Sequence, residues 1–399
     1  MTTLSRIPAS TLPSSSRVRT ETPAPSAPAV EADVARAAVP TGRDGFDVPV
    51  RSNFVERPTG RRPVEGAASE AVTALTKKAS LVGVKDGERV APSGPPVVAV
   101  FDGGVDWSHP DLQDSLWTNP GEIAGDGLDN DGNGIADDLH GFNVGFGSGD
   151  PFQGEGTDHG THVAGIIGAA DNGKGNTGVA AGKAQVLSVG GLYDGADLLT
   201  NFERSVDYVV DLKNKGANVR VVNASFGDEY RDAASQKRWK DSVQKLADAD
   251  ILLVAATANG NGSNMNKVKD FPANLDLPNV LTVASMDRNN DKLARFSSHG
   301  DKVVEMAAVG EDVLSTMPGG GWEEMSGTSM ATPLVAGTAA LMFVENPKLT
   351  AAEVRDLLVA TTEKDPDLKG KVSSSGKLDI DAAVAAARAS AEQRAALAA

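Results

Sequence analysis

The sequence predicts an α/β fold in three layers, with a mostly parallel central sheet between two layers of helices. Two observations indicate this fold class. Short apolar runs of strand length recur along the chain, beginning with Val97–Phe101. Segments with a helical pattern lie between several of these runs, so strand and helix alternate. Strands joined through helices pair in parallel and have both faces covered.

The N-terminal region does not follow this pattern. Residues 1–65 hold nine of the 21 prolines together with many Ser and Ala residues. Such a composition buries too little apolar surface to fold alone, so we expect residues 1–66 to be a disordered extension. Residues 68–81 have helical character, and we expect residues 67–95 to form a docking segment with a short helix.

The main domain is predicted over residues 96–362. Its predicted strands are Val97–Phe101, Val186–Val189, Val219–Asn223, Ile251–Ala256, Val280–Ala284 and Val303–Ala307. Its predicted helices are His159–Ala170, Leu199–Lys215, Ala233–Ala249 and a long apolar helix that Ser329 opens. Two further helices, Ala351–Ala360 and Ile380–Ala398, look structural, and residues 363–399 are predicted to be a C-terminal helical extension.

Composition narrows the function. The net charge is −16, with 13 Lys or Arg against 10 Asp or Glu in residues 1–95 and 25 against 44 in the remainder. The acidic body argues against nucleic acid and anionic membranes, and it suits calcium, cationic substrates or simply solubility. No apolar run is long enough to insert into a membrane. The absence of cysteine excludes disulfides, thiolate metal sites and a cysteine nucleophile.

Three residues with complementary chemistry stand at predicted element ends. Asp102 closes the first strand, His159 opens a helix, and Ser329 opens the apolar helix after a Gly-Thr turn. Each also fits a plain structural role, as a turn residue or a helix cap. Together they supply an acid, a base and a nucleophile. A serine hydroxyl needs an imidazole to take its proton and a carboxylate to fix the tautomer of that imidazole.

Three motifs in this order resemble those of the subtilisin-like serine proteases, the subtilases. They are Val98-Ala99-Val100-Phe101-Asp102-Gly103-Gly104-Val105, His159-Gly160-Thr161-His162-Val163-Ala164-Gly165 and Gly327-Thr328-Ser329-Met330-Ala331-Thr332-Pro333. The resemblance covers about residues 95–345. It implies a subtilisin-like fold in which Asp102 orients, His159 is the general base and Ser329 attacks the peptide carbonyl. It also implies that His162 is structural.

The same resemblance extends to the substrate site. Asn259 matches the family's oxyanion-hole asparagine, although in isolation an Asn-Gly turn would be the favoured explanation of this residue. Ser225, Phe226 and Gly227 match the strand that pairs with an extended peptide. Asp270 matches the base of the P1 pocket, where a carboxylate favours Lys or Arg unless it is a solvated loop residue. Two departures, Gly103 and Ala258, remove no reacting group.

Calcium is the expected cofactor, at two places. Residues 129–138 place Asp129, Asp131, Asn133 and Asp137 at positions 1, 3, 5 and 9 of a calcium-loop pattern, with Gly at position 6 but His140 instead of Glu at position 12. An acidic surface turn is the alternative. The resemblance adds a second site, with Asp111 and Asn172 as side-chain ligands. In both sites the ion would stabilise the fold and take no part in the reaction.

The sequence therefore predicts a calcium-stabilised serine endopeptidase that acts on extended polypeptides through an acyl-enzyme. A peptide-binding pseudoprotease and an acyl hydrolase are the alternatives. The residues 1–8 lack the apolar core of a Sec signal, so we expect a cytoplasmic protein or export by another route. We expect a monomer that binds no nucleic acid, with an inhibitor protein as a further partner.

Overall fold

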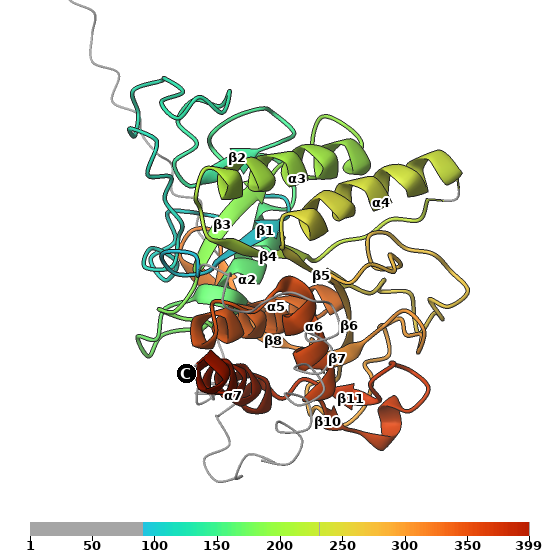
Figure 1. Ribbon diagram of the computed structural model, residues 1–399. Helices are drawn as coiled ribbons and strands as arrows, with labels where there is room; N and C mark the ends of the chain where they lie inside the picture. Colours follow the sequence, from blue (N-terminus) through green and yellow to red (C-terminus); the bar gives the residue numbers. More distant parts are fainter. Residues whose placement is uncertain (1–90, 231, 399) are drawn as a thin grey trace, which may run out of the picture. The chain divides into compact units, whose positions relative to one another are not determined.

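The computed structural model describes residues 91–230 and 232–398, and residues 1–90, 231 and 399 lie outside the described part (Figure 1). The predictions for residues 1–66 and for most of 67–95 therefore fall outside the described residues. No helix of the described part is long and apolar enough to cross a bilayer.

A sheet of nine strands forms the centre of the described domain. Its spatial order is β10-β11-β7-β6-β5-β4-β1-β3-β2. All neighbours pair in parallel except β10 and β11, which are antiparallel. The strands of this sheet are β1 (Val97–Phe101), β2 (Gly141–Asn143), β3 (Gln185–Gly190), β4 (Val219–Ala224), β5 (Leu252–Ala256), β6 (Val280–Met286), β7 (Met306–Val309), β10 (Glu363–Lys364) and β11 (Gly376–Lys377). The predicted mostly parallel sheet is confirmed.

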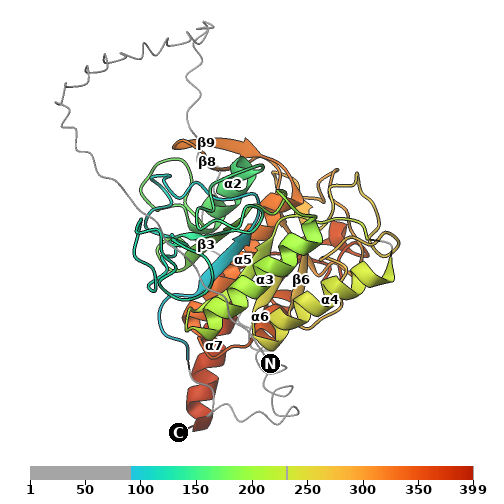
Figure 2. The same ribbon diagram turned by 90° about the horizontal axis from the view of Figure 1, so that it is seen from above.

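Helices cover both faces of this sheet (Figure 1). One layer contains α3 (Leu198–Asn214) and α4 (Ala233–Asp248). The other contains α2 (Thr157–Gly168), α5 (Thr328–Glu345), α6 (Ala351–Ala360) and α7 (Ile380–Ala398). A separate hairpin of β8 (Val313–Met317) and β9 (Gly321–Met325) lies beside α2 (Figure 2). This arrangement confirms the predicted three layers.

The position of β1 inside the sheet explains why its sequence is an unbroken apolar run. Val98 and Val100 pack into the core cluster that holds α2 and α5, whereas Val97, Ala99 and Phe101 pack into the cluster that holds α3 and α4. Successive side chains of a strand point to opposite faces, so a strand buried on both sides needs apolar residues at every position. All five residues are buried.

The predicted element bounds hold to within a few residues, and the largest difference is at β7. The apolar pair Val303–Val304 was expected to begin this strand, but both residues donate backbone hydrogen bonds to the carbonyl of Gly300 and so belong to a turn. The strand begins only at Met306. Beyond residue 362, β10 and β11 continue the central sheet, and the domain division at that point stays a prediction.

Candidate active site

Asp102 is held rigidly at the carboxyl end of β1. Its N–H donates to the carbonyl of Val189 in β3, and its own carbonyl accepts from Leu192. The side chain is fully buried, and one carboxylate oxygen accepts the N–H of Gly103 at 2.8 Å. A buried carboxylate needs further partners, because leaving it unpaired is costly.

His159 supplies the main partner of this carboxylate. It is the third residue of α2, and its Nδ1 lies 2.9 Å from both oxygens of Asp102. The helix can approach this closely because Gly160 has no side chain, since a Cβ there would lie 2.2 Å from the carbonyl oxygen of Gly104. A carboxylate only accepts, so Nδ1 carries the proton and Nε2 is left as the basic atom.

The pKa of His159 reflects two opposing effects. Burial disfavours the charged ring, but the carboxylate of Asp102, with a smaller contribution from Asp158, raises the pKa above its ordinary value of 6.5. The ring is not sealed from solvent, because 23% of the side chain remains exposed. The imidazolium that forms when His159 accepts a proton is therefore stabilised in place.

Ser329 lies at the same edge of the sheet. It is the second residue of α5, and α5 begins beside the ends of two strands: Gly327 donates its N–H to the carbonyl of Gly310 after β7, and Thr328 donates its hydroxyl to the carbonyl of Thr257 after β5. The N–H groups of a first helical turn have no partner inside the helix and face an anion favourably. This position suits a nucleophile, because the carbonyl that it attacks becomes an oxyanion beside these N–H groups.

Pro333 and Ser225 together fix the backbone of Ser329. A residue at position 333 would normally donate its N–H to the carbonyl of Ser329, but proline has no N–H. The hydroxyl of Ser225 donates to that carbonyl instead, at 2.9 Å. In return the hydroxyl of Ser329 donates to the carbonyl of Ser225 at 3.0 Å. Among the described residues no hydrogen bond joins Ser329 to His159.

Asn259 presents its amide nitrogen beside the N–H of Ser329. Its Oδ1 accepts the N–H of Thr328 at 3.1 Å, and a backbone N–H can only donate, so this bond settles which way the amide faces. The free Nδ2 and the N of Ser329 are each 3.6 Å from the position that a Cβ on Gly327 would take. Both nitrogens therefore border the same space beside Gly327.

A cleft of about 330 Å³ opens next to Ser329. The predicted substrate residues Ser225–Gly227 form one part of its lining, and residues 256–260 form another. Phe226 and Gly227 follow the end of β4, and no hydrogen bond to their backbone N–H or C=O groups is found within the described ranges. Asp270 also lines the cleft and is only 6% exposed.

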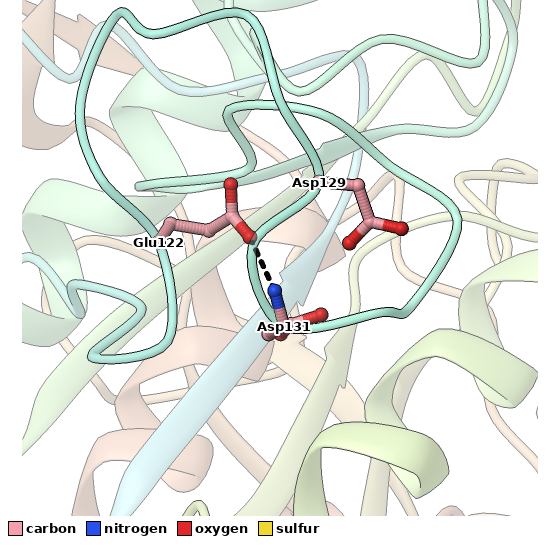
Figure 3. Close-up of side chains that lie close together, drawn as sticks. All are labelled: Glu122, Asp129 and Asp131. Atoms are coloured by element: carbon pink, nitrogen blue, oxygen red, sulfur yellow. Dashed lines mark hydrogen bonds between the residues drawn. The ribbon is translucent and has the colours of Figure 1, made fainter.

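The acidic loop holds three carboxylates together, but they are not the set that the sequence predicted. Oxygens of Glu122, Asp129 and Asp131 lie within 4.8 Å of one another (Figure 3). Three like charges at this distance repel unless a cation joins them. Of the other predicted ligands, Asn133 accepts the N–H of Ile135 and donates its amide to Asp131 at 3.3 Å, and Asp137 accepts the N–H groups of Gly125 and Gly127.

Glu122 was missed because it lies outside the ten-residue pattern. Its carboxylate folds back over the loop and accepts the N–H groups of Asn130, Asp131 and Asp137. Sequence spacing carries no signal for such a contact. The three carboxylates fit calcium, which prefers oxygen ligands, and Lys215 competes for the same charge because its Nζ lies 3.2 Å from Asp131.

The second predicted site is arranged differently. Asp111 is buried, and its two oxygens accept from the Nδ2 of Asn172 at 2.7 Å and from the Nε1 of Trp322 at 3.0 Å. Asp111 and Asn172 are thus brought together as expected. The indole of Trp322 fills one carboxylate position with a protein donor, so the donor set here fits calcium less well than the acidic loop does.

His162 has a structural environment. Its Nε2 lies 3.0 Å from the carbonyl of Glu323 in β9, and burial lowers its pKa to about 4. The side chain therefore stays neutral and connects α2 to the hairpin, as the resemblance implied.

The comparisons with known proteins agree with this geometry. A family model described as "Subtilase family" matches residues 94–381. Subtilisin-like protease 1 of Plasmodium berghei is 32% identical over 303 residues, which are 71% of this chain and 48% of that protein. Subtilisin of Bacillus pumilus is 32% identical over 270 residues, 66% of this chain and 82% of that protein.

Solved structures give the same picture. The protease domain of PatA is 26% identical with a TM-score of 0.55, and the match covers 76% of this chain and 98% of that domain. The chain spans about half the length of the Plasmodium relatives that it matches.

Proposed function

The chain belongs to the subtilase family of serine proteases, and on that premise we propose that it is a serine endopeptidase whose catalytic residues are Asp102, His159 and Ser329. The observation that supports this proposal best is the contact between His159 and the buried Asp102. It lies at the same edge of the sheet as the first turn of α5, which carries Ser329. Because Nδ1 faces Asp102, Nε2 is the basic atom of the His159 ring, and the side chain is 23% exposed.

The reaction follows from these positions. With a peptide bound, the hydroxyl of Ser329 turns from the carbonyl of Ser225 towards His159, which takes its proton as Oγ attacks the carbonyl carbon. His159 then gives the proton to the leaving amine, and the C–N bond breaks to leave an acyl-enzyme. Water, activated by the same His159, hydrolyses the ester and restores Ser329.

The oxyanion is the charge that the site must stabilise. We assign this role to the N–H of Ser329 and to the Nδ2 of Asn259, whose nitrogens border the same space beside Gly327. The buried Asp102 stabilises the imidazolium while both charges exist. The acid, the base and the two donors are held in place before substrate arrives, so little reorganisation is needed during the reaction.

The substrate on this proposal is an extended or unfolded segment of polypeptide. The backbone groups of Phe226 and Gly227 are available to pair with a peptide strand, as in β-strand addition. A folded domain offers few such segments. The site therefore favours loops, linkers and denatured chains.

Calcium is proposed as a structural ion at the acidic loop. Glu122, Asp129 and Asp131 would hold it, and bound calcium would neutralise their mutual repulsion and tie the loop to the domain. Asp138 connects the same loop to α3, because its buried carboxylate accepts hydrogen bonds from Tyr208 of that helix and from Asn133 of the loop, at 2.8 Å each. None of the three catalytic residues belongs to this cluster, so on this proposal the ion affects stability and takes no part in the reaction.

Labelling with a fluorophosphonate tests the function. We expect wild-type protein to be labelled at Ser329 and to digest casein, and the Ser329→Ala variant to do neither while keeping its circular dichroism spectrum. A folded wild-type protein that binds peptide but is not labelled would establish the peptide-binding alternative. Cleavage of short esters without cleavage of casein would establish the acyl-hydrolase alternative.

A further inference from the structure

Asn223 is a polar residue in the buried interior of the sheet. It belongs to β4, whose six residues are all buried. Its neighbours Val222 and Ala224 pack into the core cluster that holds α3 and α4, so the alternation along a strand turns Asn223 to the opposite face, where α5 lies. Among the described residues its side chain makes a single hydrogen bond, from Nδ2 to the hydroxyl oxygen of Ser225 at 2.9 Å. A buried amide is costly when it is poorly paired, so this placement calls for a reason.

The hydrogen bond from Asn223 is the first of two that end at the backbone of Ser329. The hydroxyl of Ser225 donates to the carbonyl of Ser329 at 2.9 Å. A carbonyl only accepts and a hydroxyl has one proton, so the oxygen of Ser225 can only accept from Asn223. The atom of Asn223 that faces it is therefore Nδ2, and the direction of both hydrogen bonds is fixed.

The carbonyl of Ser329 depends on this outside donor because of Pro333. The proline lies four residues further along α5, at the position that normally donates to this carbonyl, and it has no N–H. The hydroxyl of Ser225 takes that role only in the rotamer that points at the carbonyl. Nδ2 of Asn223 stabilises this rotamer, since in the other rotamers of Ser225 both hydrogen bonds are lost.

The backbone of Ser329 has to stay in place while its side chain moves. Oγ of Ser329 donates to the carbonyl of Ser225 in the free protein and turns towards His159 on the proposed reaction path. That turn breaks one of the two hydrogen bonds between Ser225 and Ser329, and the bond from the hydroxyl of Ser225 is the one that remains. It restrains the residue whose N–H we assign to the oxyanion.

We propose that Asn223 is a positioning residue for catalysis, which acts through Ser225 to hold the backbone of the nucleophile Ser329. The inference rests on the proposed endopeptidase function. Ser329 supplies both the attacking Oγ and one oxyanion donor, and these two groups act in the transition state more than in the binding of a peptide. Asn223 should therefore influence kcat more than KM.

The Asn223→Asp variant tests this inference because it keeps the shape of the side chain and reverses the hydrogen bond. An ionised carboxylate only accepts, so it draws the proton of Ser225 away from the carbonyl of Ser329. At pH 9 we expect kcat on a peptide anilide to fall about 10- to 100-fold, the range for one lost buried hydrogen bond, with KM changed less than about threefold. The ratio of variant to wild-type kcat should rise as the pH falls, because a protonated carboxyl group donates again.

The matched control is Asn279→Asp. Asn279 is also buried, just before β6, its Nδ2 donates to the carbonyl of Ile251, and its Oδ1 likewise has no partner in the described part of the chain. Both variants should lose stability in urea unfolding, because each buries a carboxylate, but only Asn223→Asp should lose kcat per folded molecule. A similar loss of kcat in both variants, or an unchanged kcat in Asn223→Asp, would overturn the inference.

The Ser225→Ala variant keeps the inference testable if Asn223→Asp does not fold. Removal of this hydroxyl should lower kcat to a similar extent, and adding Asn223→Asp should lower it less than about threefold further, since Asn223 acts through Ser225. An unchanged kcat in Ser225→Ala, or fully additive losses in the double variant, would contradict the proposed role. Fluorophosphonate labelling separates this failure from failure of the proposed function: if wild-type protein is labelled and active but these variants match it, only the positioning role is wrong.

Discussion

Replacing Asp270 by Asn is expected to stabilise the folded protein, and by an amount that grows with pH. The carboxyl group has an ordinary pKa of 3.8 and a raised pKa of about 7 in the fold, chiefly because it is buried. Between these values the folded state holds a proton that the unfolded chain has released. Its contribution to stability is therefore present below the lower value and is lost as the pH rises through the upper one.

The magnitude follows from the two values. The ionisable group costs the folded state about 1.7 kcal/mol near pH 5 and about 4.4 kcal/mol near pH 9, so the difference between the two conditions is about 2.7 kcal/mol. Asparagine has nearly the same shape and does not titrate. Comparing the pH dependence of the two proteins removes any constant cost of placing an amide in the cleft.

The measurement is urea unfolding followed by tryptophan fluorescence from pH 5 to pH 9, in a Ser329→Ala background that cannot digest itself. The free energy of unfolding of Asp270→Asn should rise relative to its parent as the pH increases. Asp276→Asn removes a carboxylate from an exposed position of the same segment and serves as the control. Its free energy of unfolding should vary with pH in the same way as that of the parent. A difference between Asp270→Asn and the parent that stays constant over this range would refute the reasoning.

Four further outcomes are expected. Asn259→Ala should lower kcat about 10²- to 10³-fold, the magnitude known for such a donor in subtilisin, a member of the same family, and stopped-flow or steady-state assays on one peptide measure it. The acidic limb of kcat/KM should be centred above pH 6.5, because the pKa of His159 is raised and the base must be neutral; a pH profile centred below that value would contradict this assignment. Chelation should lower the Tm of wild-type protein and lower that of Glu122→Gln less, and equal shifts in scanning calorimetry would argue against calcium at the loop. Trp239→Ala should cost about 3–5 kcal/mol in urea unfolding, since the indole is fully buried against Phe202, and a cost below about 1 kcal/mol would mean that the site collapses.

The order of elements was readable from the sequence because burial on both faces requires continuous apolar runs. The runs at β1, β4 and β5 were found for this reason, and α6 and α7 were placed at their observed bounds. The short strands β2, β10 and β11 near the two ends of the sheet and the hairpin of β8 and β9 were not predicted. None of them is a continuous buried apolar run, and β2 and β11 join the sheet by pairing with strands that are distant in the chain.

The residues of the candidate site likewise include some that the sequence predicted and some that it did not. Asp102, His159 and Ser329 could be named from the sequence, because nucleophilic catalysis requires those chemical groups at element ends and the three motifs place them there. The same local logic found Asp129 and Asp131. It could not find Glu122, because the contact of this carboxylate with Asn130 and Asp131 depends on how the backbone folds and is not indicated by sequence spacing.

The sequence by itself determined which chemical groups this protein has and which elements carry them, because periodicity and motifs are local properties of the chain. Only the tertiary structure decided how those groups face one another. It set the 2.9 Å contact between His159 and Asp102, the exchange of hydrogen bonds between Ser225 and Ser329 and the unpaired burial of Asp270. The two contacts join residues that are 57 and 104 apart in the chain, and the burial of Asp270 depends on surrounding segments, so the physical cause is long-range packing.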